Sequence, residues 1–146
     1  MLKDKILIVS SNYYPLLAKQ HLDACLGLLD AANASYPFTY SIEIVEAGTY
    51  EIPAVIQYFH RHQPFDGYLP LSLLLKGETD HYEFIWEHIK ESFIRFAAEG
   101  ILMGNGIITA PTMSILESRV ADKSRAIEAL NALDYLLQLK KRIASH

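Results

Sequence analysis

The sequence predicts an α/β fold in which a four-stranded parallel sheet lies between two layers of helices, a three-layer α/β/α sandwich. Four short apolar segments alternate along the chain with longer segments of helical periodicity. A parallel return between such strands needs a crossover helix, and these crossovers cover both faces of the sheet. The chain has 146 residues, 51% of them hydrophobic, so we expect a single domain over residues 1–146.

The first half of the chain is predicted to hold two strands and two helices. Residues 5–9 form a short apolar strand that ends in a polar turn at residues 10–12, and apolar residues then recur at helical spacing over residues 16–32. Residues 38–45 alternate apolar and polar side chains with the period of two that is typical of a strand. A second helix begins near Pro53, because proline suits a first turn, where an N–H would have no helical partner.

The second half begins with residues 68–75, which are nearly all apolar and typical of a strand covered on both faces. Pro70 within this run indicates an edge strand or a bulge. A third helix with one apolar face covers residues 82–96, and Gly100 stands where a helix C-terminus places glycine. Residues 101–108 predict a fourth strand, interrupted by a glycine pair.

From about Thr112 the chain is predicted to be helical. Ser114 and Glu117 have the spacing of a capping box, and a break near residues 121–122 separates a short helix from a long terminal one. Ligands of parallel α/β sheets bind beyond the carboxyl ends of the strands. This rule directs the search for a site to four loops, at residues 10–15, 46–52, 76–81 and 104–112.

Composition argues against several classes of function. Thirteen Lys and Arg against seventeen Asp and Glu give a net charge of −4, which disfavours bulk electrostatic binding to nucleic acid or an anionic membrane. No apolar stretch approaches the roughly 18 residues that span a bilayer, and the start lacks a signal-peptide core, so we expect a cytoplasmic protein. Cys25 has no cysteine to pair with and is predicted to be inert core.

The loop at residues 76–81 combines the features of an anion-binding site. Gly77 lets the backbone approach a ligand, while the free N–H groups of the following helix start attract an anion. Thr79 could add a hydroxyl donor and Lys76 a positive charge. His81 falls in the first helical turn, where the dipole favours a neutral imidazole that can take a proton. The alternative is that acidic neighbours cap the helix and the histidine is solvated.

The other loops carry weaker candidates, each with a simpler structural explanation. Glu51 could accept hydrogen bonds from a polyol, but an acid in a first helical turn also complements the helix dipole. Tyr13 and Tyr14 could stack on a flat heterocycle, although exposed loop tyrosines are common. Arg119 is either a phosphate contact or a solvated charge.

Other classes of site lack their signatures. The sequence has no G-x-x-x-x-G-K-[ST], no G-x-G-x-x-G and no G-x-S-x-G motif. His60 and His62 cannot point to the same side of a helix, and His81 with His88 lacks a third ligand. We therefore expect no metal and no other cofactor.

Four motifs occur in a distinctive order and together resemble the lumazine synthase family of riboflavin biosynthesis. The resemblance covers nearly the whole chain, is strongest over residues 46–86 and 104–119, and implies a flavodoxin-like form of the predicted fold. The motifs are Gly48-x-x-Glu51-Ile52-Pro53, Asp66-Gly67-Tyr68, Lys76-Gly77-Glu78-Thr79-Asp80-His81-Tyr82-Glu83 and Gly104-Asn105-Gly106-Ile107-Ile108-Thr109.

The resemblance implies a transferase that acts on two small molecules. It condenses 5-amino-6-(ribitylamino)uracil with 3,4-dihydroxy-2-butanone 4-phosphate to 6,7-dimethyl-8-ribityllumazine, and releases phosphate and water. An amine adds to the ketone to give an imine, phosphate is eliminated, and the second amine closes the ring. The family also implies a homo-oligomer, a pentamer or a multiple of it, with each site between adjacent subunits.

The resemblance also implies roles for individual residues. His81 matches the proton-transfer histidine, and Arg119 the arginine that pairs with the substrate phosphate. Tyr13 matches the residue that stacks on the pyrimidine ring, and Glu51 the acceptor of ribityl hydroxyls. The other matches are Gly77, Glu78 and Thr79 for the phosphate, Thr49 and Tyr50 for the ribityl chain, Leu74 and Leu75 beside the heterocycle, Asn105 from a neighbouring subunit, and Lys123 at a lysine of the family.

Departures from the family's usual pattern leave alternatives open. Ala47 stands where proline is usual, Lys76 where arginine is usual, and Tyr14 where many members have asparagine. Residues 120–125 lack the glycine-rich hinge that influences how pentamers pack into shells, so the size of the assembly stays open. One alternative is a non-catalytic member that binds a flavin or lumazine. Another is a flavodoxin-like signalling or FMN-binding module. The sequence lacks both the acidic pair of a phosphate-receiving signalling domain and the hydroxyl–glycine loop that holds the FMN phosphate.

Overall fold

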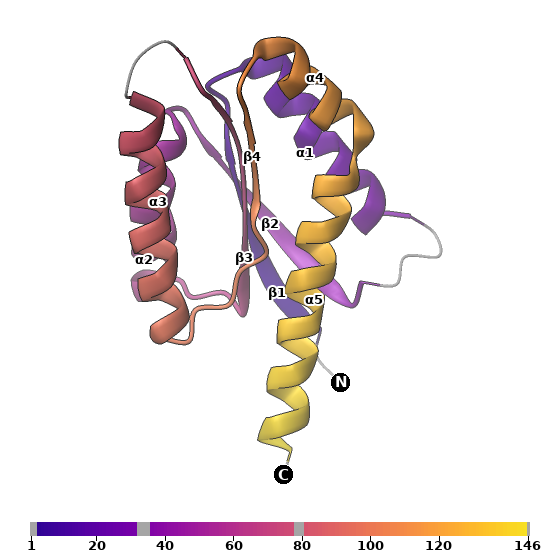
Figure 1. Ribbon diagram of the computed structural model, residues 1–146. Coiled ribbons are helices and arrows are strands. Elements are labelled where there is room, and N and C mark those ends of the chain that lie inside the picture. Colours follow the sequence, from indigo (N-terminus) through magenta and orange to yellow (C-terminus); the bar gives the residue numbers. More distant parts are fainter. Residues whose placement is uncertain (1–2, 32–35, 78–80, 146) are drawn as a thin grey trace.

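A computed structural model of the chain describes residues 3–31, 36–77 and 81–145. It contains a four-stranded sheet of order β2-β1-β3-β4 in which every neighbouring pair is parallel. Helices cover both faces (Figure 1), so the predicted three-layer, flavodoxin-like α/β fold is confirmed. The strands are β1 (Asp4–Ser11), β2 (Phe38–Val45), β3 (Gly67–Leu75) and β4 (Gly106–Ala110).

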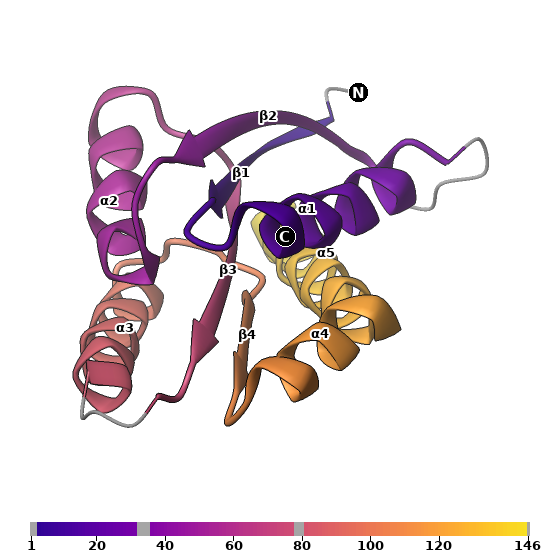
Figure 2. The same ribbon diagram turned by 90° about the horizontal axis from the view of Figure 1, so that it is seen from above.

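The two helical layers differ in size. Figure 2 looks along the sheet from above and shows β2 and β4 at its two edges, with the helices divided between its faces. One layer holds α1 (Pro15–Leu29), α4 (Met113–Asp122) and α5 (Ser124–Ala144), and the other holds α2 (Ile52–His62) and α3 (His81–Ala98), with the short 3₁₀ helix η1 (Thr49–Glu51) preceding α2.

In the part of the chain that the structure describes, no helix has the length and hydropathy needed to cross a membrane.

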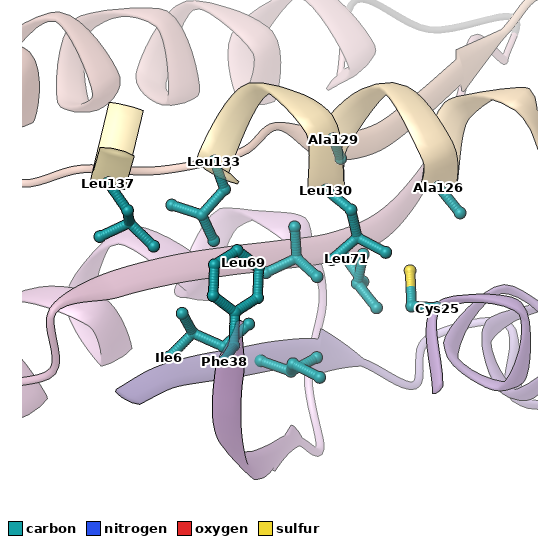
Figure 3. Packing of buried hydrophobic residues seen from close by; sticks show 11 residues of the cluster. Ile6, Cys25, Phe38, Leu69, Leu71, Ala126, Ala129, Leu130, Leu133 and Leu137 are labelled. Carbon is teal, nitrogen blue, oxygen red and sulfur yellow. The ribbon is translucent and has the colours of Figure 1, made fainter. Parts of the chain in front are cut away.

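Both faces of the central strand β1 are buried. Ile6 and Ile8 pack toward α1 and α5, whereas Leu7 and Val9 pack toward α2 and α3. Figure 3 shows the α5 side of this core, where leucines of α5 lie over β3. The continuous apolar runs of β1 and β3 follow from this arrangement, because neither face of the inner strands meets water.

Pro70 lies in the interior of the sheet, so the expectation of an edge strand or a bulge was wrong. Tyr68, two residues earlier, directs its backbone N–H and C=O toward the β4 side, where it forms an isolated bridge with Met103. Pro70 directs its backbone to the same side, because these directions alternate along a strand. Regular β4 pairing begins only at Gly106. The missing N–H of Pro70 therefore falls where the ladder is already interrupted.

The strand β1 extends further than the sequence predicted. Ser10 and Ser11 were expected in a turn, but both continue the pairing with β2 and are buried. The hydroxyl of Ser11 donates a hydrogen bond to the carbonyl oxygen of Ala47, at 2.6 Å. A buried hydroxyl is tolerated here because it has a partner.

The start of α4 also differs from the prediction. Thr112 is the N-cap, and its Oγ1 accepts a hydrogen bond from the backbone N–H of Ile115 at 3.3 Å. The predicted capping box of Ser114 and Glu117 is wrong, because both residues lie within the helix. The predicted break between the last two helices is confirmed at Lys123, which has a left-handed backbone with φ of 66°.

The glycine pair before the fourth strand is explained by close packing. A Cβ on Gly104 would overlap the carbonyl oxygen of Ala129 in α5, and a Cβ on Gly106 would lie 2.7 Å from the carbonyl oxygen of Pro70. Only glycine allows the backbones to approach this closely. Gly104 therefore sets the distance between the β4 segment and α5.

The helix α1 contributes a histidine to the core that the sequence analysis did not single out. His21 is only 2% exposed, and its Nε2 lies 2.8 Å from the carbonyl oxygen of Gly106. Because the carbonyl only accepts, Nε2 carries the proton and donates. Burial lowers the pKa of His21 and outweighs the opposing effect of this hydrogen bond. Cys25, one turn later, is confirmed as core, and burial raises the pKa of its thiol to about 12.

We expect Gly104→Ala to lower the free energy of unfolding by about 1–3 kcal/mol, because the added methyl group displaces α5. Urea denaturation followed by circular dichroism measures the change. Gly27→Ala, in α1, is the matched control: its Cβ would meet no atom within 4 Å, and alanine in a helix stabilises by about 0.5–1 kcal/mol relative to glycine. Equal effects of the two substitutions would contradict the packing explanation.

The burial of neutral His21 predicts a pH-dependent stability. The pKa of His21 in the folded protein lies below its unfolded value of about 6.5. The stability that comes from burying the neutral imidazole is therefore complete above that pH, and it is lost as the pH falls through the folded pKa. We expect wild type to lose up to about 1.4 kcal/mol per pH unit more than His21→Gln, which keeps a donor for the carbonyl. Unfolding free energies of both proteins between about pH 7 and 5 test this, and parallel curves would refute it.

Candidate active site

A cavity of about 460 Å³ opens at the carboxyl ends of the strands, the upper end of the sheet in Figure 1. Its wall is formed by the loop before α1, the segment around η1, the end of β3 and the first turns of α3. Parallel strands end at the same edge, so four segments that are distant in sequence meet here. Eight of the predicted site residues line the cavity: Tyr13, Thr49, Tyr50, Glu51, Leu74, Leu75, Gly77 and His81.

Tyrosine rings form one wall of the cavity. The ring of Tyr14 packs at the N-terminus of α1 against the cluster around Leu73. Tyr13 stands nearly perpendicular to it, with ring centroids 4.9 Å apart, and is 65% exposed. Burial, followed by the neighbouring Tyr13, raises the pKa of Tyr14, so the Tyr14 phenol is neutral at physiological pH. Tyr13 presents an exposed aromatic face on which a flat ligand can stack.

The 3₁₀ helix η1 is attached to the sheet through a buried hydroxyl pair. Thr49 is buried, and its Oγ1 lies 2.7 Å from the Oγ of Ser72 in β3. Glu51 is exposed, and its Oε1 accepts a hydrogen bond from the backbone N–H of Gly48 at 3.1 Å. Glu51 thus stabilises the start of the turn while it also lines the cavity, so the structural and the ligand-binding interpretations are compatible.

The end of β3 forms an apolar part of the wall. Leu74 is nearly buried and packs with Ile85 and Ile89 of α3. Leu75, the next residue, points to the opposite face of the sheet and packs toward α4. Successive side chains of a strand alternate in this way. Both leucines nevertheless line the cavity, because the cavity lies at the end of the strand.

The loop between β3 and α3 brings a histidine to the cavity. His81 is exposed and is the first residue of α3. Gly77 leaves the space beside it open, because a Cβ there would meet no atom within 4 Å. Lys76 points to Glu83, with 3.8 Å between Nζ and Oε1. Three residues named in the sequence analysis lie outside the described residues: Glu78, Thr79 and Asp80.

Arg119 and Asn105 do not line the cavity of their own chain. Arg119 belongs to α4 and reaches β4 with its side chain, and Asn105 directly precedes β4. Arg119 donates a hydrogen bond from Nη1 to the carbonyl oxygen of Thr109. The carbonyl of Ala110 accepts from the N–H of Lys76, the residue after β3. Because carbonyl directions alternate along a strand, that of Thr109 faces the open edge of the sheet. Asn105 is exposed, and its Oδ1 accepts from the N–H of Ile107 at 3.0 Å.

Three of the four loops selected in the sequence analysis contribute residues to the cavity, whereas no residue of the fourth, at 104–112, lines it. Asn105 precedes β4, whereas residues 111–112 follow it, so the two parts of the predicted loop lie at opposite ends of the strand. Lys123 is also separate from the cavity. It borders a different hollow of about 420 Å³ together with Lys19 and Asp23 of α1.

The sequence analysis missed several residues at the cavity. Phe84 lines it, is 65% exposed, and lies nearly parallel to the ring of Tyr50, with centroids 6.1 Å apart. A signal was present, because Phe84 is an apolar residue outside the predicted apolar face of its helix. Ser72, which contacts Thr49 but does not line the cavity, had no such signal, since a single serine in an apolar strand does not reveal its partner. Among the described residues, no group of three His, Cys, Asp or Glu side chains is placed to hold a metal ion.

Comparison with known proteins finds similarity over almost the whole chain. Residues 3–141 match the family model described as 6,7-dimethyl-8-ribityllumazine synthase. A protein of that name from Jannaschia sp. (strain CCS1) is 34% identical over 135 residues, which cover 92% of this chain and 72% of the relative. Another from Sphingopyxis alaskensis is 30% identical over 140 residues, which cover 94% and 95% of the two chains.

Proposed function

The chain belongs to the 6,7-dimethyl-8-ribityllumazine synthase family, whose members are transferases, and from this premise we propose that it condenses 5-amino-6-(ribitylamino)uracil with 3,4-dihydroxy-2-butanone 4-phosphate. The product is 6,7-dimethyl-8-ribityllumazine, a step of riboflavin biosynthesis. One observation carries the proposal: residues from four separate segments, selected by sequence alone, line one cavity. A cavity of about 460 Å³ is within the usual size range of small-molecule sites.

The proposed pyrimidine substrate binds between the tyrosine wall and η1. The exposed face of Tyr13 stacks on the heterocycle, and the leucines at the end of β3 cover the ring from the other direction. Glu51 accepts hydrogen bonds from ribityl hydroxyls, since its carboxylate has acceptor capacity beyond the one bond to Gly48. Holding the two reactants in register removes much of the entropic barrier to their condensation.

The proposed phosphate site lies at the start of α3. Backbone N–H groups at a helix start attract anions, and Gly77 leaves room for the phosphate to approach. His81 lines the same cavity and is proposed to move protons during imine formation and ring closure, while phosphate is the leaving group. Positioned proton transfer of this kind contributes about 10²–10⁴-fold.

We assign Arg119 and Asn105 to the site of an adjacent subunit. Asn105 directly precedes β4, an edge strand, and Arg119 of α4 contacts the same strand through the carbonyl of Thr109. Neither residue lines the cavity of its own chain. An arginine that enters from the neighbouring protomer would pair with the phosphate in bidentate fashion. The proposed assembly is therefore a homo-oligomer with shared sites, a pentamer or a multiple of it.

The alternative is a non-catalytic member that binds a flavin or lumazine. It is favoured by Tyr14, whose aromatic ring occupies part of the cavity wall. Both functions need the same stacking surface, so turnover decides between them. Tight riboflavin binding without lumazine formation would establish the alternative.

The purified protein should accelerate lumazine formation from the two substrates, followed by product absorbance. We expect His81→Ala to lower kcat by about 10²-fold without abolishing turnover, because positioning remains. Arg119→Ala should mainly raise KM for the phosphate substrate. His62→Ala and Arg125→Ala, at exposed positions of α2 and α5, are the controls and should behave as wild type. A wild-type rate equal to the uncatalysed rate would refute the proposal.

Shared sites predict complementation between two impaired variants. In assemblies that contain equal amounts of His81→Ala and Arg119→Ala, about a quarter of the sites pair an intact His81 with an intact Arg119. Co-expression of the two differently tagged chains should therefore restore activity well above either variant alone. Activity equal to the mean of the two variants would show that each chain uses its own arginine.

A further inference from the structure

A second histidine of α3 contacts the cavity wall from outside. His88 packs its ring on that of Tyr50, with centroids 4.0 Å apart and an angle of 24° between the planes. Its Nε2 lies 3.1 Å from the carbonyl oxygen of Tyr50. Because that oxygen only accepts, Nε2 carries the proton and donates the hydrogen bond. Ring and backbone of Tyr50 are thus both held by one side chain.

His88 does not line the cavity itself. It borders a groove of about 340 Å³ between α2 and α3, and Tyr50 and Glu51 border both spaces. The segment around Tyr50 is therefore the wall that separates the cavity from the groove. Any effect of His88 on a ligand in the cavity must pass through this wall.

The wall depends on contacts from outside itself. A 3₁₀ turn as short as η1 has few hydrogen bonds of its own. Here the N–H of Glu51 donates to the carbonyl of Gly48 at 3.3 Å, and the N–H of Ile52 donates to the carbonyl of Thr49. The N–H of Gly48 also donates to Oε1 of Glu51. On the sheet side it is held by the pair of Thr49 and Ser72. On the α3 side the hydrogen bond comes from His88, while Tyr50 itself is 41% exposed.

We propose that His88 is a positioning residue that holds the Thr49–Glu51 segment against the ribityl chain of the substrate. The inference rests on the proposed function, since that segment is where the ribityl hydroxyls bind. Loss of the contact lets the backbone of Tyr50 and the carboxylate of Glu51 move from their binding positions. The phosphate is proposed to bind at the start of α3, seven residues before His88, and His88 does not line the cavity.

Three variants separate the two parts of the contact. His88→Phe keeps an aromatic ring but loses the donor, His88→Gln keeps a donor but loses the ring, and His88→Ala loses both. We expect His88→Ala to raise KM for the ribitylamino substrate about tenfold, the effect of one hydrogen bond and one ring contact. The KM for the phosphate substrate and kcat should change less than about twofold, and the other two variants should lie between.

The matched control is His62→Ala. His62 is an exposed histidine of α2 that also packs on a tyrosine, Tyr58, with centroids 4.5 Å apart, but it lies outside the cavity wall. It should leave both KM values unchanged. If His88→Ala raised both KM values equally, or lowered kcat in proportion to a lower Tm, the role would be general stability and the inference would fall.

Binding measurements distinguish this failure from failure of the proposed function. Riboflavin carries a ribityl chain on a flat heterocycle, and lumichrome has the same three fused rings, as the alloxazine tautomer, without the chain. Fluorescence titration should show that His88→Ala weakens riboflavin about tenfold and lumichrome less than twofold. This result would support the inference even if wild type formed no lumazine. Equal losses for both ligands, or a wild type that binds riboflavin no better than lumichrome, would overturn it.

Discussion

The common direction of the strands is the constraint on which the rest of the site depends. Because β1, β2 and β3 all run the same way, their carboxyl ends meet at one edge of the sheet. The segments that follow them are brought together there, although they are far apart in sequence. The wall of tyrosines, the η1 turn and the start of α3 share a cavity for this reason. An antiparallel sheet would distribute the same segments between two ends.

Buried polar groups attach η1 and α1 to the sheet. A buried hydroxyl or imidazole is costly without a partner, so Thr49 with Ser72, and His21 with Gly106, restrict the positions of the elements that carry them. The first pair places η1 beside β3. The second places α1, whose N-terminus carries the tyrosine wall, against the start of β4.

The position of β4 explains why a single chain does not assemble every residue proposed for the site. An edge strand has one unpaired side, and Arg119 occupies that side through the carbonyl of Thr109. The close packing at Gly104 holds the same segment against α5. Arg119 and Asn105 do not line the cavity of their own chain, which is the geometric basis of the proposed sharing between subunits.

The sequence by itself determined the elements, their order and the class of fold, because hydrophobic period, caps and turn residues act over a few neighbouring positions. It also selected His81, Glu51 and Tyr13, which stand at strand ends and helix starts. Only the tertiary structure decided that Pro70 is tolerated in an inner strand, that His21 is buried, and that Arg119 lies outside its own cavity. Each of these depends on which segment packs beside another, and such long-range contacts leave no local pattern. The contact of His88 with Tyr50 is of the same kind, since 38 residues separate the two in the chain.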